Sequence, residues 1–211
     1  MAVTINGSGP VTGVTTLASP TTINGLTLPS DSLQPGMVLV TPTSVAGTGV
    51  TLSGAVVTLS ATGSASVNGC FTSTYANYYL VFSAIAGSAS GSLFALRLRA
   101  SGTDDSSSNY AYGQNYALYS GSGGAAGATA GTSFAAFMSK TNAKKGGVVT
   151  TLTSPQLAET TGYFMQSIRY DAADTQAGAH NVNSAFDGFT ILTTNTTTIS
   201  GTIRIYGLRN S

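Results

Sequence analysis

The chain alternates short runs of β-branched and aromatic residues with turns rich in Gly, Ser, Thr and Asn. The clearest runs are residues 189–193 and 199–207. In the second run Ile199, Ile203 and Ile205 share one face, because successive side chains of a strand point to opposite sides. A Thr/Asn segment without helix formers joins the runs, so the pattern predicts a β-hairpin that closes a sheet formed by earlier strands.

Two earlier runs have the same character. Residues 78–82 are apolar on both faces, as in a central strand, and residues 93–99 place Arg97 and Arg99 opposite an apolar face. The Gly/Ser turn between them predicts a second hairpin. Further strands are predicted at residues 37–40, 50–67, 109–119, 134–138, 148–152 and 163–170, and a Gly/Ala loop at residues 121–131. Without an amphipathic helix, these runs predict an all-β fold, an antiparallel jelly-roll-like β-sandwich.

Proline and aromatic residues divide the chain into three parts. Residues 1–36 contain four prolines and two Asn-Gly turns but neither Phe nor Tyr, so they lack the groups for a core of their own. We expect an extended docking segment there, with an unattached tail as the alternative. Its two similar pieces supply the expected docking residues Ile5, Asn6, Gly7, Ile23, Asn24 and Gly25. Residues 37–69 are predicted to be a β-rich connecting region, and residues 70–211 the β-sandwich domain.

Composition narrows the range of partners. Charged residues make up 7% of the chain and apolar residues 42%, which predicts a folded rather than a disordered protein. The formal net charge is +1 and no basic run occurs, so nucleic acid is not expected as a partner. A surface this poor in charge gains little solubility from self-repulsion. Association with further copies or docking into a larger particle is the natural consequence.

Few residues offer reactive or metal-binding chemistry. Cys70 is the only cysteine, so neither a disulfide within the chain nor a cysteine-based metal site is expected, and nothing indicates a cofactor. His180 is the only histidine, and the acidic residues show no spacing that singles out an acid and a base. Asp104 and Asp105 offer oxygen ligands without the spacing of an EF-hand, which favours a solvated turn. No signal peptide or membrane span is evident, so we expect synthesis in a cytoplasm and no membrane insertion.

Two sets of side chains are candidates for contacts. Tyrosine combines a flat apolar ring with a polar tip, which suits a receptor surface, an interface or a partly buried core position. The candidates of this kind are Tyr110, Tyr112, Tyr116 and Tyr119. Arginines on strand faces can pair with acids across strands or across subunits, or form plain surface ion pairs. The candidates of this kind are Arg97, Arg99 and Arg204 with Asp171 and Asp187.

Four stretches of the chain resemble bacteriophage tail-fibre and minor virion structural proteins. They are residues 75–81 (YANYYLV), 96–104 (LRLRASGTD), 109–110 (NY) and 200–209 (SGTIRIYGLR). The resemblance covers about residues 70–211 and implies a fibre-tip β-sandwich, commonly a homotrimer, carried by an N-terminal segment that docks on other virion proteins. It implies a virion location but does not fix the role, because such modules occur as receptor binders, baseplate parts and head or neck appendages. Contact of the loop tips with a host surface glycan is the more specific form of the expectation. A capsid or head decoration protein, a head-fibre protein and a polysaccharide-cleaving tail enzyme are the alternatives, and a non-enzymatic role is the expectation.

The division of labour between the segments can be tested by truncation. A chain that begins at Gln34 is expected to fold cooperatively but to fail to incorporate into particles, because residues 1–36 supply attachment and no aromatic group. Copy number per particle and urea unfolding measure the two halves of this prediction. Normal incorporation of the truncated chain, or loss of its cooperative unfolding, would contradict it.

Overall fold

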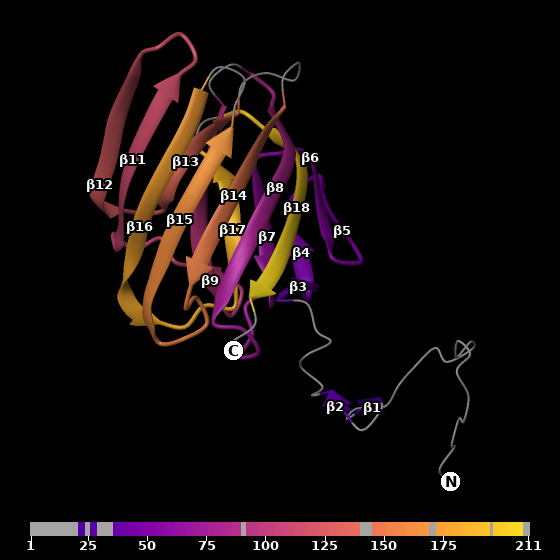
Figure 1. Ribbon diagram of the computed structural model, residues 1–211. Helices are drawn as coiled ribbons and strands as arrows, with labels where there is room; N and C mark the ends of the chain where they lie inside the picture. Colours follow the sequence, from indigo (N-terminus) through magenta and orange to yellow (C-terminus); the bar gives the residue numbers. More distant parts are fainter. Residues whose placement is uncertain are drawn as a thin grey trace. The chain divides into compact units, whose positions relative to one another are not determined.

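The computed structural model describes residues 21–23, 26–28, 36–89, 92–139, 145–168, 172–194 and 196–208. The chain divides into two units, Met1–Gly36 and Met37–Ser211. In the first unit β1 (Thr21–Ile23) and β2 (Leu26–Leu28) pair antiparallel (Figure 1). Ile23 is the last residue of β1, whereas the other expected docking residues, Ile5, Asn6, Gly7, Asn24 and Gly25, lie outside the described part of the chain.

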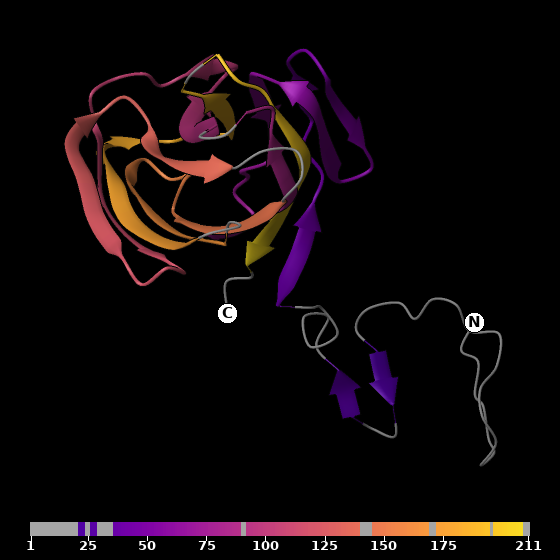
Figure 2. The same cartoon turned by 90° about the horizontal axis from the view of Figure 1, so that it is seen from above.

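Two antiparallel sheets make up the second unit (Figures 1 and 2). The described strands of the large sheet are, in spatial order, β12 (Gly123–Gly131), β11 (Tyr110–Leu118), β16 (Ala172–Ser184), β15 (Glu159–Ile168), β14 (Gly146–Thr153), β8 (Asn77–Gly87), β18 (Ile199–Leu208), β6 (Val56–Thr62) and β5 (Val50–Ser53), with β3 (Met37–Val40) also pairing with β18. Those of the small sheet are β10 (Thr103–Asp104), β9 (Ser92–Ala100), β17 (Gly188–Thr193), β7 (Ser64–Asn68) and β4 (Ser44–Ala46), with β13 (Phe134–Ser139) also pairing with β9. No helix occurs among the described residues, which confirms the prediction of an all-β antiparallel sandwich.

The core lies between the inner faces of the two sheets and is rich in aromatic rings. The ring of Phe82, on β8 of the large sheet, lies 6.3 Å from Phe94 on β9 and 6.4 Å from Phe189 on β17. Phe71 adds contacts at 5.9 Å to Phe189 and 4.8 Å to Tyr78. Aromatic pairs at these distances stabilise beyond the area that they bury, so these rings hold the sheets together.

The last strand, β18, is central in the large sheet. It pairs with β8 along its whole length on one side, and on the other side with β6 and then with β3. Ile199, Ile203 and Ile205 are buried on its inner face, as the alternation of this run predicted. The large sheet is therefore complete only when the end of the chain has joined strands from its beginning.

Both predicted hairpins are wrong, because each pair of runs is divided between the two sheets. β17 lies in the small sheet and β18 in the large one, and β8 and β9 are divided in the same way. Alternation within a run shows which residues are buried but not which strand is the neighbour. In both cases the connecting turn carries the chain across the sandwich instead of back along the same sheet.

The region predicted to connect the docking segment to the sandwich is part of the sandwich itself. β3, β5 and β6 belong to the large sheet, whereas β4 and β7 belong to the small one. Val57, Leu59 and Val67 are buried in the common core. This region contains neither Phe nor Tyr, it alternates only weakly, and Gly54 and Gly63 interrupt it, so its sequence did not indicate that it belongs to the core.

The predicted Gly/Ala loop is instead strand β12, at the edge of the large sheet, paired with β11. Its small residues make room for the tyrosines of β11. A methyl group on Gly124 would lie 2.6 Å from Tyr116 Oη and under 3 Å from two ring carbons, so this ring covers the glycine. A ring placed across a strand glycine supplies the packing that glycine lacks.

A second ring over glycine gives a test of the core. A methyl group on Gly207 of β18 would lie 2.2 to 2.6 Å from ring carbons of Tyr75, including the carbon that joins the ring to its stem. We expect Gly207→Ala to destabilise the fold by about 1 to 3 kcal/mol through overpacking, measured by urea unfolding. Gly113→Ala is the matched control, since a methyl group there meets nothing within 4 Å. Equal stability of the two variants would contradict this account.

Candidate functional site

Arg99 is the most extensively bound of the predicted arginines. It is 9% exposed and projects from the outer face of the small sheet. Its Nη1 pairs with Asp104 Oδ1 and also lies near Ser66 and Thr190, while Nε and Nη2 reach Asn68 and the adjoining turn. These acceptors are Asn68 Oδ1 at 3.1 Å, Ser66 Oγ at 2.9 Å, Thr190 Oγ1 at 2.8 Å and the carbonyl of Gly102. A guanidinium held by several acceptors fixes neighbouring strands and is not available for a ligand.

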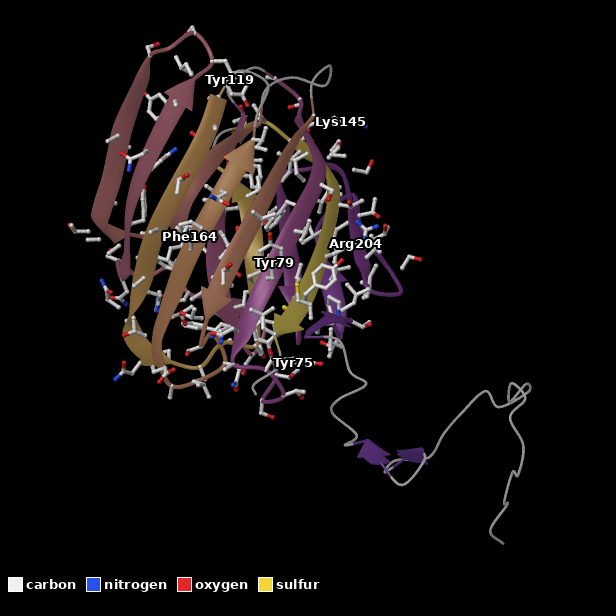
Figure 3. The ribbon with its side chains drawn as sticks, viewed as in Figure 1. Tyr75, Tyr79, Tyr119, Lys145, Phe164 and Arg204 are labelled. Atoms are coloured by element: carbon white, nitrogen blue, oxygen red, sulfur yellow. The ribbon has the colours of Figure 1, made fainter. Side chains whose placement is uncertain are left out.

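The described contacts of Arg99 and Asp187 differ from the pairing that the sequence predicted, and pairing with Asp171 stays a prediction. Arg99 pairs with Asp104, while Asp187 Oδ2 accepts a hydrogen bond from the backbone N–H of Ser101 at 3.1 Å. Asp171 lies outside the described residues. Arg97 donates from Nε to the carbonyl of Thr132 at 2.9 Å. Arg204 stands on the outer face of the other sheet, so the three arginines do not form one site (Figure 3).

The turn at Asp104 and Asp105 links the two sheets. Asp104 Oδ1 also accepts a hydrogen bond from Thr190 Oγ1 at 2.7 Å in the small sheet. Asp105 Oδ2 lies 2.9 Å from Nε2 of His180 on β16 of the large sheet. The sequence favoured a solvated turn here, but these contacts make it a structural tie, and neither His180 nor its partner was predicted. Two adjacent acidic residues in a chain with so few charges are the sequence feature that could have indicated this structural role.

The environment of His180 does not suit nucleophilic catalysis. The ring is fully buried between Tyr110 and Phe186, with centroids 4.6 and 5.0 Å away. Nε2 lies 2.9 Å from Asp105 Oδ2, but neither ring nitrogen makes a hydrogen bond of suitable geometry to a described residue. Burial raises the pKa of Asp105, but hydrogen bonds from Ser107 and the nearby His180 outweigh it and leave this pKa below its usual value. The contacts orient a structural pair and present no reactive hydroxyl to the imidazole.

The four predicted tyrosines occupy three different environments. Tyr110 is fully buried, its Oη donates to the carbonyl of Asp105 at 2.8 Å, and it accepts from the N–H of Leu98 at 3.0 Å. Tyr112 and Tyr116 are partly exposed and share the inner face of β11. Tyr119 is 63% exposed in the turn beyond that strand. The spacing of four tyrosines therefore mixes core and surface positions, and only Tyr112 and Tyr116 form a common surface.

Polar groups accompany these two tyrosines on the inner face of the large sheet. Gln114 stands between them, and its Nε2 lies 3.5 Å from Asp174 Oδ1 on β16. Asp174 is buried and its Oδ2 accepts a hydrogen bond from Ser167 Oγ at 3.0 Å. Aromatic rings flanked by amide and carboxylate groups are the kinds of side chain that contact sugars, so this tyrosine face is one candidate for ligand contact.

The outer face of the large sheet is the second candidate. Its alternate residues point away from the core and fall into two register rows that cross the sheet. The first row is Leu39, Tyr206, Tyr79, Thr151, Phe164, Ala177, Gly113 and Gly127, and the second is Arg204, Val81, Val149, Gln166, Thr175, Asn115 and Ala125. We call these two rows the outer face. Arg204 is the only charged residue in them, and Figure 3 shows it on the same side as Tyr79 and Phe164.

Large apolar side chains are exposed on and beside the outer face. Phe164 is 45% exposed and Leu39 is 44% exposed, while Met37 and Ile168, on the same strands, are 43% and 67% exposed. Large apolar side chains exposed on one face of a sheet are typical of an interaction site. In the sequence, this face is visible only as uncharged residues at alternate positions of several strands. These residues form one surface only after the strands have been placed side by side.

Other kinds of site find no support in the described part of the chain. No group of three or more His, Cys, Asp or Glu residues there is placed to hold a metal ion. Among the described residues, no helix has the length and the apolar character that crossing a membrane requires.

Comparisons with known proteins leave the family open. No protein-family model matches the chain, and no curated protein matches it either. Two solved structures of the exoplasmic/lumenal domain of VIP36 align over much of the chain. The Ca²⁺/Man3GlcNAc-bound form has a TM-score of 0.37 and 7% identity, covering 82% of this chain and 89% of that one. The Ca²⁺-bound form has a TM-score of 0.30 and 10% identity, covering 87% and 88%. Likenesses this weak support no inference.

The role of Arg99 as a structural tie can be tested against its neighbour. We expect Arg99→Ala to lower the free energy of unfolding by about 1.5 to 3 kcal/mol, because several charge-assisted hydrogen bonds are lost at a mostly buried position. Arg97→Ala is the control, since Arg97 is more exposed and, among the described residues, donates to the carbonyl of Thr132 alone. Urea unfolding of both variants measures the difference. An Arg99 variant as stable as the Arg97 variant would rule out the tie.

Proposed function

We propose that this chain is a structural protein of a phage virion, a short homotrimeric tail fibre or appendage without enzymatic activity. It is made in the host cytoplasm and docks on other virion proteins through residues 1–36. The resemblance of residues 70–211 to tail-fibre and minor virion proteins supports this proposal. So does the chemistry of the described residues, which offer structural contacts rather than a reactive centre.

The outer face is the observation that carries the proposal. It crosses the large sheet with Arg204 as its only charged residue, and large apolar groups are exposed on it. Charged residues are normally spread over the surface of a monomer that is soluble by itself. A sheet face of this composition is better suited to contact with a further protein surface, as in a homo-oligomer or a particle.

The tyrosine face gives the proposed appendage a surface for the host. Tyr112 and Tyr116 are partly exposed, with Gln114 between them and Asp174 behind. We place the contact with a host surface glycan here, because aromatic rings stack on sugar faces while an amide such as that of Gln114 binds hydroxyls. The buried Asp174 lies within reach of the Gln114 amide and positions it. In this proposal the outer face makes the contacts of assembly, and the tyrosine face, which lies on the inner side of the large sheet beyond the core, makes the contact with the host.

Light scattering on the purified protein and electron microscopy of particles carrying a tagged chain test the proposal together. We expect a trimer at micromolar concentration and the tag at a tail appendage, because the outer face calls for a partner. A stable monomer would contradict the trimer. A tag on the head would favour a decoration or head-fibre protein, and release of reducing ends from host polysaccharide would favour a tail enzyme.

A further inference from the structure

A hollow of about 390 Å³ opens on the outer side of the large sheet, where β8, β14 and β15 run side by side. Its walls are mostly apolar and are formed by residues that belong to the outer face or lie just beyond it. The residues that the argument uses are Val81, Ala84, Gly147, Val149, Gln166 and Ile168. The volume is within the range of pockets that hold small organic groups, about 300 to 1,000 Å³.

The hollow has a local cause in the backbone. The register between β8 and β14 shifts between the pairs Val148 with Phe82 and Gly146 with Ile85, so β8 carries an extra residue there. Ala84 has a φ of +54°, as the bulged strand bends away from regular geometry. Gly147 beside it has no side chain to fill the space. A bulge of this kind is a built feature of a sheet and gives the hollow a fixed shape.

The group that fits the hollow stands on the same face. Phe164 is 45% exposed. It is followed on the same face of β15 by Gln166 and Ile168, which line the hollow. Its side chain lies on the sheet surface beside the hollow and is paired in register with Thr151 and Ala177, neither of which covers it. The ring and the hollow occupy different positions on one face, so the ring of one copy of the chain can enter the hollow of another copy.

We propose that Phe164 of one copy of this chain inserts into the hollow of a second copy, so that the outer face is the interface of the homo-oligomer. This inference rests on the proposed function in taking the partner to be another copy. The size of the face agrees with it. The outer side of the large sheet extends beyond the two rows, since seven residues of β14 pair with β15. Eight strands at about 4.8 Å spacing span about 34 Å and seven residues at about 3.3 Å rise span about 20 Å, which gives roughly 700 Å², near the roughly 800 Å² that each partner buries in a standard interface.

Charge and shape both favour a second copy over other occupants. Arg204 is the only charged residue in the two rows, so two such faces meet without repulsion between many like charges. Ring and hollow occupy different places on the face, so the contact can be reciprocal about a two-fold axis or can run from copy to copy around a closed ring. Aromatic anchors that enter a pocket on the partner dominate the affinity of many interfaces.

A charge at the anchor tests the contact. We expect Phe164→Asp to shift the protein to monomer, with association at least tenfold weaker in sedimentation or light scattering. Leu157→Asp is the matched control, because Leu157 is 38% exposed but lies in the turn between β14 and β15, away from the outer face. Thermal unfolding shows whether each variant is folded. A Phe164→Asp variant that is folded and still fully associated would overturn the inference.

Cross-linking gives a second readout that does not depend on dissociation. Two differently tagged chains, one with Ala177→Cys beside Phe164 and one with Val149→Cys in the wall of the hollow, are co-expressed and treated with a short bismaleimide. We expect a product that carries both tags, whereas a Leu157→Cys chain in place of the Ala177→Cys chain gives none. The native Cys70 adds no background, because burial raises the pKa of its thiol and encloses it.

The outcomes separate this inference from the proposed function. A trimer without the doubly tagged product would leave the virion role standing and overturn the contact. A dimer with the product would support the contact and overturn the trimer. A wild-type protein that stays monomeric at high micromolar concentration, and whose hollow instead takes up an apolar dye in a manner blocked by Val149→Asp, would identify a ligand pocket and overturn the contact.

Discussion

The packing of the two inner faces around Phe82 is the constraint on which the rest of this structure depends. Phe82 on the large sheet contacts Phe94 and Phe189 on two neighbouring strands of the small sheet. Neither sheet can bury its apolar face alone. Because the chain crosses between the sheets from β8 to β9 and from β17 to β18, this core forms only when distant segments have met. Folds dominated by contacts between residues distant in the sequence form slowly.

That constraint also decides what is left on the surface. Each strand of the large sheet uses one set of alternate residues for the core, and the other set becomes the outer face. The same uncharged composition that suits a packed interior then covers the outside of the sheet, where Phe164 and Leu39 are exposed. The association that we propose would cover these side chains. The bulge at Ala84 adds shape to the face, since it opens a hollow in an otherwise regular sheet.

The few charges near the core act inside the fold. Asp104 pairs with Arg99 on the small sheet and Asp105 lies beside His180 on the large one, so one turn ties both sheets together. Tyr110 reinforces this tie through its hydroxyl, which bonds to the carbonyl of Asp105 and to the N–H of Leu98. In such pairs each polar group satisfies the other, and the pairs fix the register of the strands that carry them. None of these charged residues lies on the outer face.

The sequence by itself determined the all-β class, the inner face of β18 and the absence of a disulfide, because alternation and composition are local properties. It could not assign neighbours. A run such as 189–193 shows which side is buried, yet only tertiary packing decided that it faces β18 across the core instead of pairing with it. The glycines of β12 resembled a loop until Tyr116 was placed over them. The outer face and its hollow likewise required strand order and a bulge, which depend on contacts between residues far apart in the chain.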